Sequence, residues 1–253
     1  LNVISSNNKP VERLFSSYFR KRRYAGSSDR LAIKDLTYNI LRHRGRLDWW
    51  IKRINSLLEL SPRARIISEL ALKKNFPLYK IQSLFNGTKY CPHPMTDIED
   101  ALAEALYGET LNHSEMPSFV TLEYPRWMDQ ILKSLWSERL AVEMSALNQP
   151  AQVDVRVNTL KTTLDAARRS LLKDSIKSEQ TPMSPIGLRL TSRARINETT
   201  AFRMGWVEVQ DEGSQLIALL SDAKPDMDVV DLCAGAGGKT LALAATMGVN
   251  TKI

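Results

Sequence analysis

Apolar residues in the first part of the chain recur at intervals of three and four positions. One such set consists of Val11, Leu14, Phe15, Tyr18 and Phe19. This spacing places apolar side chains on one face of a helix, so it predicts an amphipathic helix. Comparable sets predict further helices that begin near residues 31, 47, 62, 77, 96, 125 and 138. Because no strand pattern interrupts them, we expect an all-helical domain over residues 1–145.

The helix near residue 96 has a sequence signal for its first turn. Thr96 is followed three positions later by Glu99, which is the pattern of a capping box. Asp97 and Asp100 add negative charge where the helix dipole is positive. We therefore expect Thr96 to be the N-cap of this helix.

The pattern changes near residue 150. Apolar and polar residues alternate, as in half-buried strands, at residues 152–157, 187–190 and 206–209. Helical patterns lie between and after these strands, at residues 163–172 and 212–220. We interpret residues 146–222 as a linker and an α/β segment that precedes a catalytic domain.

A strand of another type is predicted at residues 227–232. This run is apolar without alternation, which is typical of a strand buried on both faces of its sheet. A glycine-rich turn at residues 235–238 and a helix from Lys239 follow, and this order opens a doubly wound α/β fold. We therefore predict an α + α/β protein in which residues 223–253 are the start of a Rossmann-like domain that is incomplete.

Positive charge is concentrated in the first fifth of the chain. Residues 1–53 hold 13 Lys and Arg against 4 Asp and Glu, a net charge of +9, whereas the remaining residues hold 22 against 24, a net charge of −2. Such asymmetry indicates a polyanionic partner. Aromatic residues lie among the basic ones and no lipidation motif is present, so the pattern favours nucleic acid over a membrane.

Several classes of protein are excluded by the composition. No apolar run approaches the roughly 20 residues of a membrane span, and no signal peptide is evident. Only two cysteines are present, Cys91 and Cys233, which argues against a disulfide framework and favours the cytoplasm. The three histidines have no metal-ligand spacing, and we expect no metal site. We expect a monomer.

The glycine-rich turn at residues 235–238 leaves three cofactor classes to compare. A phosphate-binding P-loop would need glycine at the position of Cys233, and a dinucleotide fingerprint would need it at Thr240. S-adenosylmethionine requires an acidic residue at a strand end and a short glycine turn, which Asp231 and residues 235–238 supply. The alternative without a ligand is a turn that only packs the strand against the helix.

Three segments resemble the RNA (cytosine-5) methyltransferases. Residues 231–240 read Asp-Leu-Cys-Ala-Gly-Ala-Gly-Gly-Lys-Thr, similar to the family's Asp-x-Cys-Ala-Ala-Pro-Gly-Gly-Lys-Thr cofactor motif. The departure is Gly235-Ala236 in place of Ala-Pro. Residues 156–161 resemble its Arg-x-Asn-x-x-Lys signature, and residues 205–215 contain its Gln-Asp-x-x-Ser segment. The order and spacing of the three agree with the family.

The helical part resembles one branch of that family, the bacterial small-subunit rRNA (cytosine-5) methyltransferases. Members of this branch carry an N-terminal RNA-binding domain similar to the NusB antitermination factor, and residues 29–48 are similar to its second and third helices. The resemblance implies methylation of carbon 5 of cytosine in ribosomal RNA with S-adenosyl-L-methionine as cofactor. It implies cofactor contacts from Gln210, Asp211, Asp231, Cys233, Ala234, Gly235, Ala236, Gly237, Gly238 and Lys239.

RNA contacts are expected from two groups of residues. The basic cluster consists of Arg20, Lys21, Arg22, Arg23, Arg42, Arg44 and Arg46, which suit sequence-independent phosphate contacts. The resemblance adds Arg156, Asn158 and Lys161, which it implies help form the RNA side or the cofactor side of the cleft, and a structural role at the joint between domains is an equal alternative. Trp49 and Trp50 are interpreted as core residues, although base stacking is the alternative.

The catalytic cysteines of the family lie in a Pro-Cys and a Thr-Cys segment, and neither pair occurs among these 253 residues. We expect the nucleophile to follow Ile253 and Cys233 to be a small buried packing residue, so that these residues alone are inactive. The second hypothesis is a non-catalytic RNA-binding or antitermination-like protein with a truncated α/β remnant. Catalytic motifs downstream in the reading frame would decide between the two.

Overall fold

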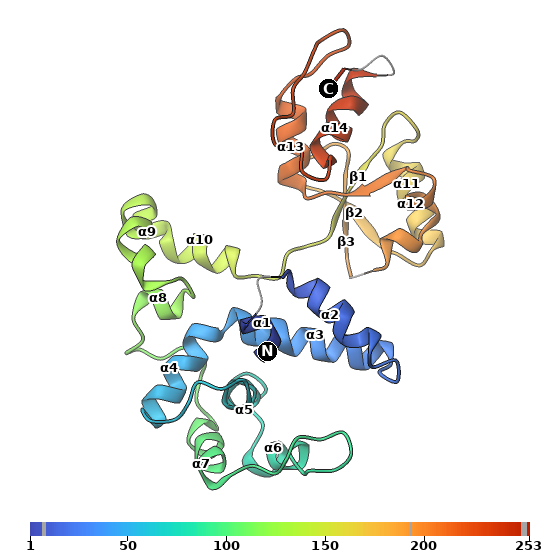
Figure 1. Cartoon of the computed structure of the whole chain (residues 1–253). Helices are drawn as coiled ribbons and strands as arrows, with labels where there is room; N and C mark the ends of the chain where they lie inside the picture. Colours follow the sequence, from blue (N-terminus) through green and yellow to red (C-terminus); the bar gives the residue numbers. More distant parts are fainter. Residues whose placement is uncertain (7–8, 193, 249–251) are drawn as a thin grey trace. The chain divides into compact units, whose positions relative to one another are not determined.

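The computed structural model describes residues 1–6, 9–192, 194–248 and 252–253. Packing divides these residues into two units, Leu1–Gln149 and Pro150–Ile253, which we call the helical unit and the sheet unit (Figure 1). Each unit has a hydrophobic core of its own.

The helical unit contains only helices and loops among its described residues. The main helices are α2 (Val11–Arg20), α3 (Ser27–Arg42), α4 (Arg44–Ile54), α5 (Pro62–Leu72), α6 (Leu78–Leu84), α7 (Asp97–Leu106), α9 (Asp129–Trp136) and α10 (Leu140–Leu147). Shorter turns are α1 (Asn2–Ser5), α8 (Ser118–Thr121), η1 (Arg126–Met128) and η2 (Ser137–Arg139). The helices expected from the apolar spacing are thereby confirmed, although α4 begins three residues earlier and ends four residues earlier than its pattern indicated.

The core of the helical unit lies between α3, α4, α5 and α7. Leu47, Ile51 and Ile67 have no exposed surface, and such large apolar side chains stabilise the fold by leaving water. Trp50 is also buried, and its indole nitrogen donates a hydrogen bond to the carbonyl of Leu111 at 3.1 Å. The interpretation of Trp50 as a core residue is confirmed.

The capping box at the start of α7 is present as expected. The backbone nitrogen of Thr96 donates to the carboxylate of Glu99 at 2.9 Å, and the nitrogen of Glu99 donates to the hydroxyl of Thr96 at 3.4 Å. Burial raises the pKa of Glu99, but hydrogen bonds from Arg63 and Thr96 outweigh it and leave that pKa below its ordinary value. The reciprocal bonds satisfy two of the N–H groups that a helix start leaves unpaired.

The sheet unit begins with a four-stranded antiparallel sheet. Its elements in chain order are β1 (Asp154–Val157), α11 (Leu164–Lys173), β2 (Ser178–Gln180), β3 (Gly187–Leu190), η3 (Ile196–Glu198), α12 (Thr200–Arg203), β4 (Val207–Val209) and α13 (Glu212–Leu220). The strand order is β2-β3-β1-β4. This βαββαβ order is that of a ferredoxin-like fold. The sequence patterns indicated β1, β3 and β4 but missed β2 and α12.

The two faces of this sheet have different chemistry. Val155, Leu188 and Val207 are buried on one face, in a core shared with residues of α11 and α12. Since successive strand residues point to opposite faces, Asp154 and Arg156 lie on the other face. That face is covered by the start of α13, to which Asp154 bonds. One face of the sheet is therefore apolar, and the other carries charged groups.

The strand expected at residues 227–232 is not formed as a regular strand. Within the described residues, the segment makes one parallel bridge, between Asp228 and Lys252. Val230 is 83% and Leu232 90% exposed, so burial on both faces is wrong for this structure. A strand buried on both faces needs sheet neighbours and covering helices, and the described residues supply only this one bridge. The helix predicted after the glycine turn is confirmed as α14 (Gly238–Met247).

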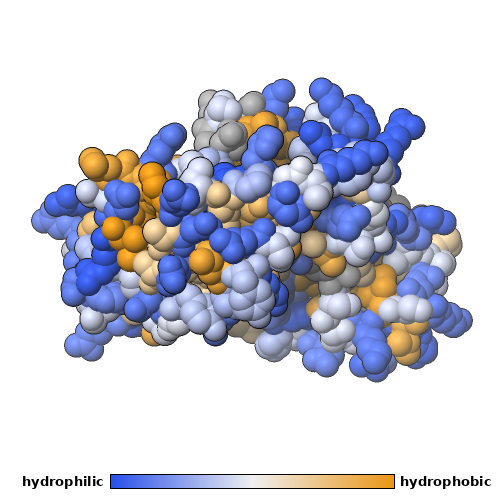
Figure 2. All heavy atoms as spheres, turned by 90° about the horizontal axis from the view of Figure 1, so that it is seen from below, coloured by the Kyte–Doolittle hydropathy of each residue, from blue (hydrophilic) through white to orange (hydrophobic). Residues whose placement is uncertain are grey.

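Hydrophilic side chains dominate the face drawn in Figure 2, where apolar residues form several separate groups. Within the part of the chain that the structure describes, no helix has the length and apolar character required to span a bilayer. The same residues contain no cluster of three or more metal-ligating side chains.

Candidate functional site

Arg156 connects the two family-like motifs of the sheet unit. Its Nε donates to Oε1 of Gln210 at 2.8 Å, and its Nη2 donates to the carboxylate of Glu208 at 2.6 Å. Arg156 is only 1% exposed. A buried guanidinium held at both ends has one orientation, because each charge-assisted bond restricts it. Arg156 thereby attaches the first motif, residues 156–161, to the second motif, residues 205–215.

Asn158 and Lys161 hold the turn that precedes β4. The side-chain nitrogen of Asn158 donates to the carbonyl of Gly205 at 3.2 Å, and the ammonium of Lys161 donates to the carbonyl of Met204 at 3.3 Å. Gly205 has φ +66°, and a Cβ there would lie 2.8 Å from the Lys161 nitrogen, so glycine fits this turn. These contacts give both residues a structural role, and contact with RNA stays a prediction.

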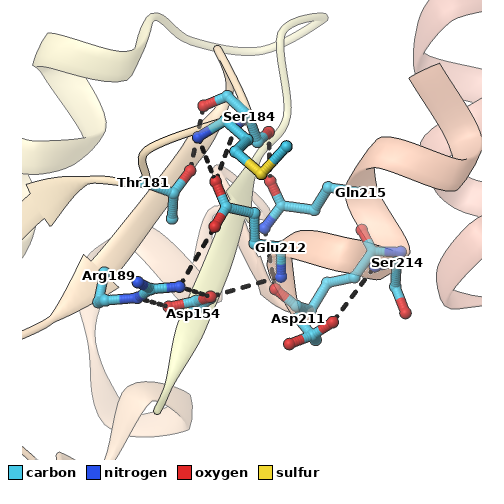
Figure 3. Close-up of polar contacts among 10 residues, drawn as sticks. Asp154, Thr181, Ser184, Arg189, Asp211, Glu212, Ser214 and Gln215 are labelled. Carbon is cyan, nitrogen blue, oxygen red and sulfur yellow. Dashed lines mark hydrogen bonds and ion pairs between the residues drawn. The ribbon is translucent and has the colours of Figure 1, made fainter. Parts of the chain in front are cut away.

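A polar network fixes the start of α13 against the sheet (Figure 3). Arg189 binds both carboxylate oxygens of Asp154, at 2.8 and 2.9 Å, and also the carboxylate of Glu212 at 3.3 Å. The other oxygen of Glu212 accepts from the backbone nitrogens of Met183 and Ser184 at 2.6 and 2.9 Å. The network therefore connects β1, β3 and the loop after β2 to the first residue of α13.

Opposing effects act on the pKa of Glu212. Burial raises it, but the hydrogen bonds from the Met183 and Ser184 amides and the charge of Arg189 leave it below its ordinary value. Glu212 is thus ionised near neutral pH. Its role in the structure is to accept these bonds, which hold the start of α13.

Gln210 and Asp211 lie at the junction between β4 and α13. Asp211 caps α13, because its carboxylate accepts from the nitrogen of Ser214 at 3.3 Å. The carbonyl of Gln210 accepts from the side chain of Gln215 at 2.9 Å, and Gln215 is itself bound by Ser184 at 2.7 Å. Asp211 thus has a structural role as the N-cap of α13, and its contact with a cofactor stays a prediction. Gln210 is held at both its backbone and its side chain.

The turn before α14 is open, and its backbone adopts a left-handed conformation that favours glycine. Gly235 and Gly237 have φ of +57° and +83°. A Cβ on Gly237 would meet no atom within 4 Å, and this residue provides no side-chain cap for α14. The hydroxyl of Thr240 donates to the carboxylate of Asp231 at 2.8 Å, which closes the loop across its base. The first N–H groups of α14 consequently face an uncovered turn.

The three motifs meet at Gln210. A Cβ on Gly238, the first residue of α14, would lie 3.7 Å from Nε2 of Gln210. This nitrogen is buried and has no hydrogen-bond partner among the described residues, and the same is true of Nη1 of Arg156. Buried donors without a partner are rare in folded proteins and indicate an absent acceptor. The donors and the helix start together suit a ligand with a carboxylate or phosphate group.

Other expected site residues have ordinary surroundings. Ala234 and Ala236 lie exposed in the turn, and Lys239 is exposed at the start of α14. Cys233 is exposed, so its interpretation as a buried packing residue is wrong. The reason is local: residues 232–233 lie in a turn at the end of the poorly paired segment and are not packed against a sheet.

The basic cluster of the helical unit divides into paired and unpaired residues. Arg46 is largely buried and binds the carboxylate of Glu123 at 2.9 Å. Arg22 lies 4.0 Å from the ring centre of Tyr18, and Arg42 lies 5.5 Å from that of Tyr38. Arg44 is exposed, 3.9 Å from a carboxylate oxygen of Asp48. The exposed residues that make no ion pair within the described chain are Arg20, Lys21 and Arg23.

Comparison with known proteins matches residues 124–197 to the family described as Methyltr_RsmF/B-like, ferredoxin-like domain. A relative from Synechocystis, named probable ribosomal RNA small subunit methyltransferase B, is 31% identical over 127 residues, which are 49% of this chain and 28% of the relative. Ribosomal RNA small subunit methyltransferase B from Sodalis glossinidius is 25% identical over 230 residues, 84% of this chain and 51% of the relative. The resemblance drawn from the motifs is confirmed.

The chain is thus similar to proteins named ribosomal RNA small subunit methyltransferase B. It spans about half the length of the Sodalis protein, and the match to the Synechocystis protein covers a smaller share. The crystal structure of PH0851 covers 96% of this chain and 58% of that protein, with a TM-score of 0.64 and 23% identity. At that identity the likeness concerns the fold, and it extends over both units.

The sequence alone gave no signal for part of the site. Asp154, Arg189 and Glu212 are far apart along the chain, and neither their spacing nor their types indicate that they form one network. The pairing of Arg156 with Gln210 was also missed, because the two residues belong to separate motifs. Only the neighbouring registers of β1 and β4 bring them together.

Proposed function

We propose that the protein containing these residues transfers a methyl group from S-adenosyl-L-methionine to carbon 5 of cytosine in small-subunit ribosomal RNA. The observation that supports this most directly is the open glycine turn at the start of α14, next to an unpartnered buried donor of Gln210. The names of the curated relatives support ribosomal RNA as the substrate.

The residues around the turn fit such a cofactor. Asp231, residues 234–239, Gln210 and Asp211 are the residues that would hold it. The cofactor supplies an electrophilic methyl group when bound. These residues bind and orient it: Gly235 and Gly237 allow close approach of the backbone, and the α14 N–H groups attract negative charge. We propose that residues 223–253 form the beginning of a Rossmann-like catalytic domain.

The helical unit is proposed to bind RNA as a NusB-like domain. Its exposed Arg20, Lys21 and Arg23 have no competing ion pair among the described residues, so they are available for phosphates. We propose a monomeric cytoplasmic protein, with residues 1–145 holding the RNA, residues 146–222 as a linker and pre-catalytic segment, and residues 223–253 beginning the domain that binds the cofactor.

The proposal is tested with radiolabelled S-adenosylmethionine and small-subunit ribosomal RNA. The product of the whole reading frame is expected to transfer label to carbon 5 of cytosine, identified by nuclease digestion and mass spectrometry. The 253 residues alone are expected to transfer none, because they contain neither a Pro-Cys nor a Thr-Cys pair. Transfer by these residues alone would refute the assignment of the nucleophile. RNA binding without transfer by the whole product would favour a non-catalytic role.

A further inference from the structure

The side-chain amide of Gln210 has a defined orientation. Its Oε1 accepts a hydrogen bond from Nε of Arg156 at 2.8 Å. Arginine has no acceptor, so the amide oxygen must face the guanidinium and the amide nitrogen must face away. The carbonyl of Gln210 is held separately by Gln215. The direction of Nε2 is therefore determined by Arg156.

The amide nitrogen is directed towards the start of α14. The Cβ position of Gly238 lies 3.7 Å from it, and Gln210 is 8% exposed with Nε2 unpartnered in the described chain. The helix contributes its unpaired first-turn N–H groups next to this nitrogen. Because Gly237 offers no side-chain cap, these donors have no acceptor of their own in the described chain. An acceptor with negative charge fits this position.

Arg156 adds charge and rigidity to this arrangement. Its Nη2 is fixed by Glu208 at 2.6 Å, and only 1% of Arg156 is exposed. Rotation of the Gln210 amide would place its NH₂ group against the guanidinium donor, which costs the bond at Oε1. The salt bridge with Glu208 thus keeps Arg156, and through it Gln210, in one state. A fixed donor loses little entropy when a ligand binds.

We propose that Arg156 is a positioning residue that holds the Gln210 amide as a donor for the carboxylate of the cofactor's amino-acid portion. The site then selects adenosine ligands that carry this carboxylate over those that lack it. This inference rests on the proposed cofactor. Arg156 acts through Gln210 and touches neither the cofactor nor the RNA in this proposal.

The probes are S-adenosylhomocysteine, which has the carboxylate, and 5′-methylthioadenosine, which lacks it. Each is titrated into the ¹⁵N-labelled product of the whole reading frame, since residues 223–253 only begin the proposed cofactor domain, and amide resonances are recorded so that millimolar dissociation constants are measurable. The side-chain NH₂ signal of Gln210 is identified by its loss in Gln210→Met, a variant of similar volume without donors. Gln180→Met is the matched control, because Gln180 is exposed on β2 and the substitution is the same.

The native chain is expected to bind S-adenosylhomocysteine at least about tenfold more tightly than 5′-methylthioadenosine, the difference typical of a hydrogen bond to a charged group. Only the first ligand should shift the Gln210 NH₂ signal. Gln210→Met should remove most of that preference and leave binding of 5′-methylthioadenosine within about twofold, whereas Gln180→Met should change neither. Arg156→Lys, which keeps the charge but lacks the planar guanidinium, should reduce the preference by a smaller factor.

Two results would overturn the inference while leaving the proposed cofactor intact. One is equal binding of the two ligands by the native chain. The other is that Gln210→Met weakens the binding of both ligands equally, or weakens the binding of neither. Binding of neither ligand would overturn the inference together with the cofactor assignment. A variant that fails to fold is recognised from its backbone spectrum, and the native comparison of the two ligands then decides.

Discussion

The helical unit and the sheet unit are held together by different interactions. In the helical unit the most buried large side chains are mainly apolar, such as Ile51, Ile67 and Leu102. In the sheet unit, Asp154 and Arg156 are as buried as those residues, and each is bound by named partners. Apolar packing tolerates small displacements, whereas in a buried polar network each hydrogen bond restricts the direction of its groups and each group without a partner is costly. The candidate site lies in the sheet unit, where the polar network restricts the orientation of its side chains.

Ile51→Ala should have the largest effect on stability, and it tests the helical side of the comparison. Ile51 has no exposed surface, so truncation loses apolar burial and leaves a cavity. We expect the free energy of unfolding of the helical unit to fall by about 2–5 kcal/mol. Urea titration followed by tryptophan fluorescence measures this.

Ile54→Ala in the same helix is the matched control, because Ile54 is 38% exposed. It should cost clearly less than Ile51→Ala. Equal losses in the two variants would show that burial in this core does not determine the stability of the helical unit.

Glu212→Gln tests the polar network and should have a smaller effect that depends on pH. The folded-state pKa of Glu212 lies below its ordinary value of 4.5, so the charged carboxylate stabilises the fold above that pH. This contribution is lost as the pH falls through the folded-state pKa. The thermal midpoint of the variant should be lower than that of the native chain at pH 7, and the difference should shrink below about pH 4.

Glu179→Gln provides the comparison for that experiment, since Glu179 is an exposed residue on β2. Its thermal midpoint should follow that of the native chain at every pH. A difference for Glu212→Gln that stays constant from pH 7 to pH 3 would mean that the charge of Glu212 does not hold the start of α13.

The double variant Lys21→Ala with Arg23→Ala should leave stability almost unchanged and alter only RNA binding. Both side chains are exposed. If each contacts a phosphate, the slope of log binding constant against log salt should decrease by about 1.5 in magnitude. Filter binding of small-subunit ribosomal RNA over a salt series measures the slope. Lys73→Ala with Lys74→Ala removes the same charge from another exposed part of the helical unit, and an equal change there would argue against a specific RNA face.

Local patterns were sufficient to predict most of the elements. The apolar spacing in the helical unit and the capping box of Thr96 both concern residues that lie a few positions apart in the sequence. The glycine turn was also recognised, because positive φ at Gly235 and Gly237 requires that residue type. Such features depend on residues that are close together in the sequence, so a local sequence pattern is sufficient to predict them.

Features that depend on distant residues were not predictable in the same way. β2 is short and its residues are polar or only partly buried, so alternation gives it no signal. The bonds from Arg189 to Asp154 and Glu212 depend on strand register. The apolar run at residues 227–232 was misread because its composition suits burial, whereas its exposure depends on what packs against it. In each of these cases the structure depends on tertiary contacts that the local sequence does not show.

The carboxylate of Glu123 has a consequence for dividing the protein into pieces. It accepts hydrogen bonds from the backbone nitrogens of Gly45 and Arg46, at 2.7 and 3.1 Å, as well as the side chain of Arg46. The family match begins at the next residue, Tyr124. Expression of the matched region from that boundary would remove α9 and α10 from their packing partners. The N-terminal piece would then end at Glu123, the residue that binds the start of α4. A boundary after Gln149 is therefore the better choice for preparing the helical unit alone.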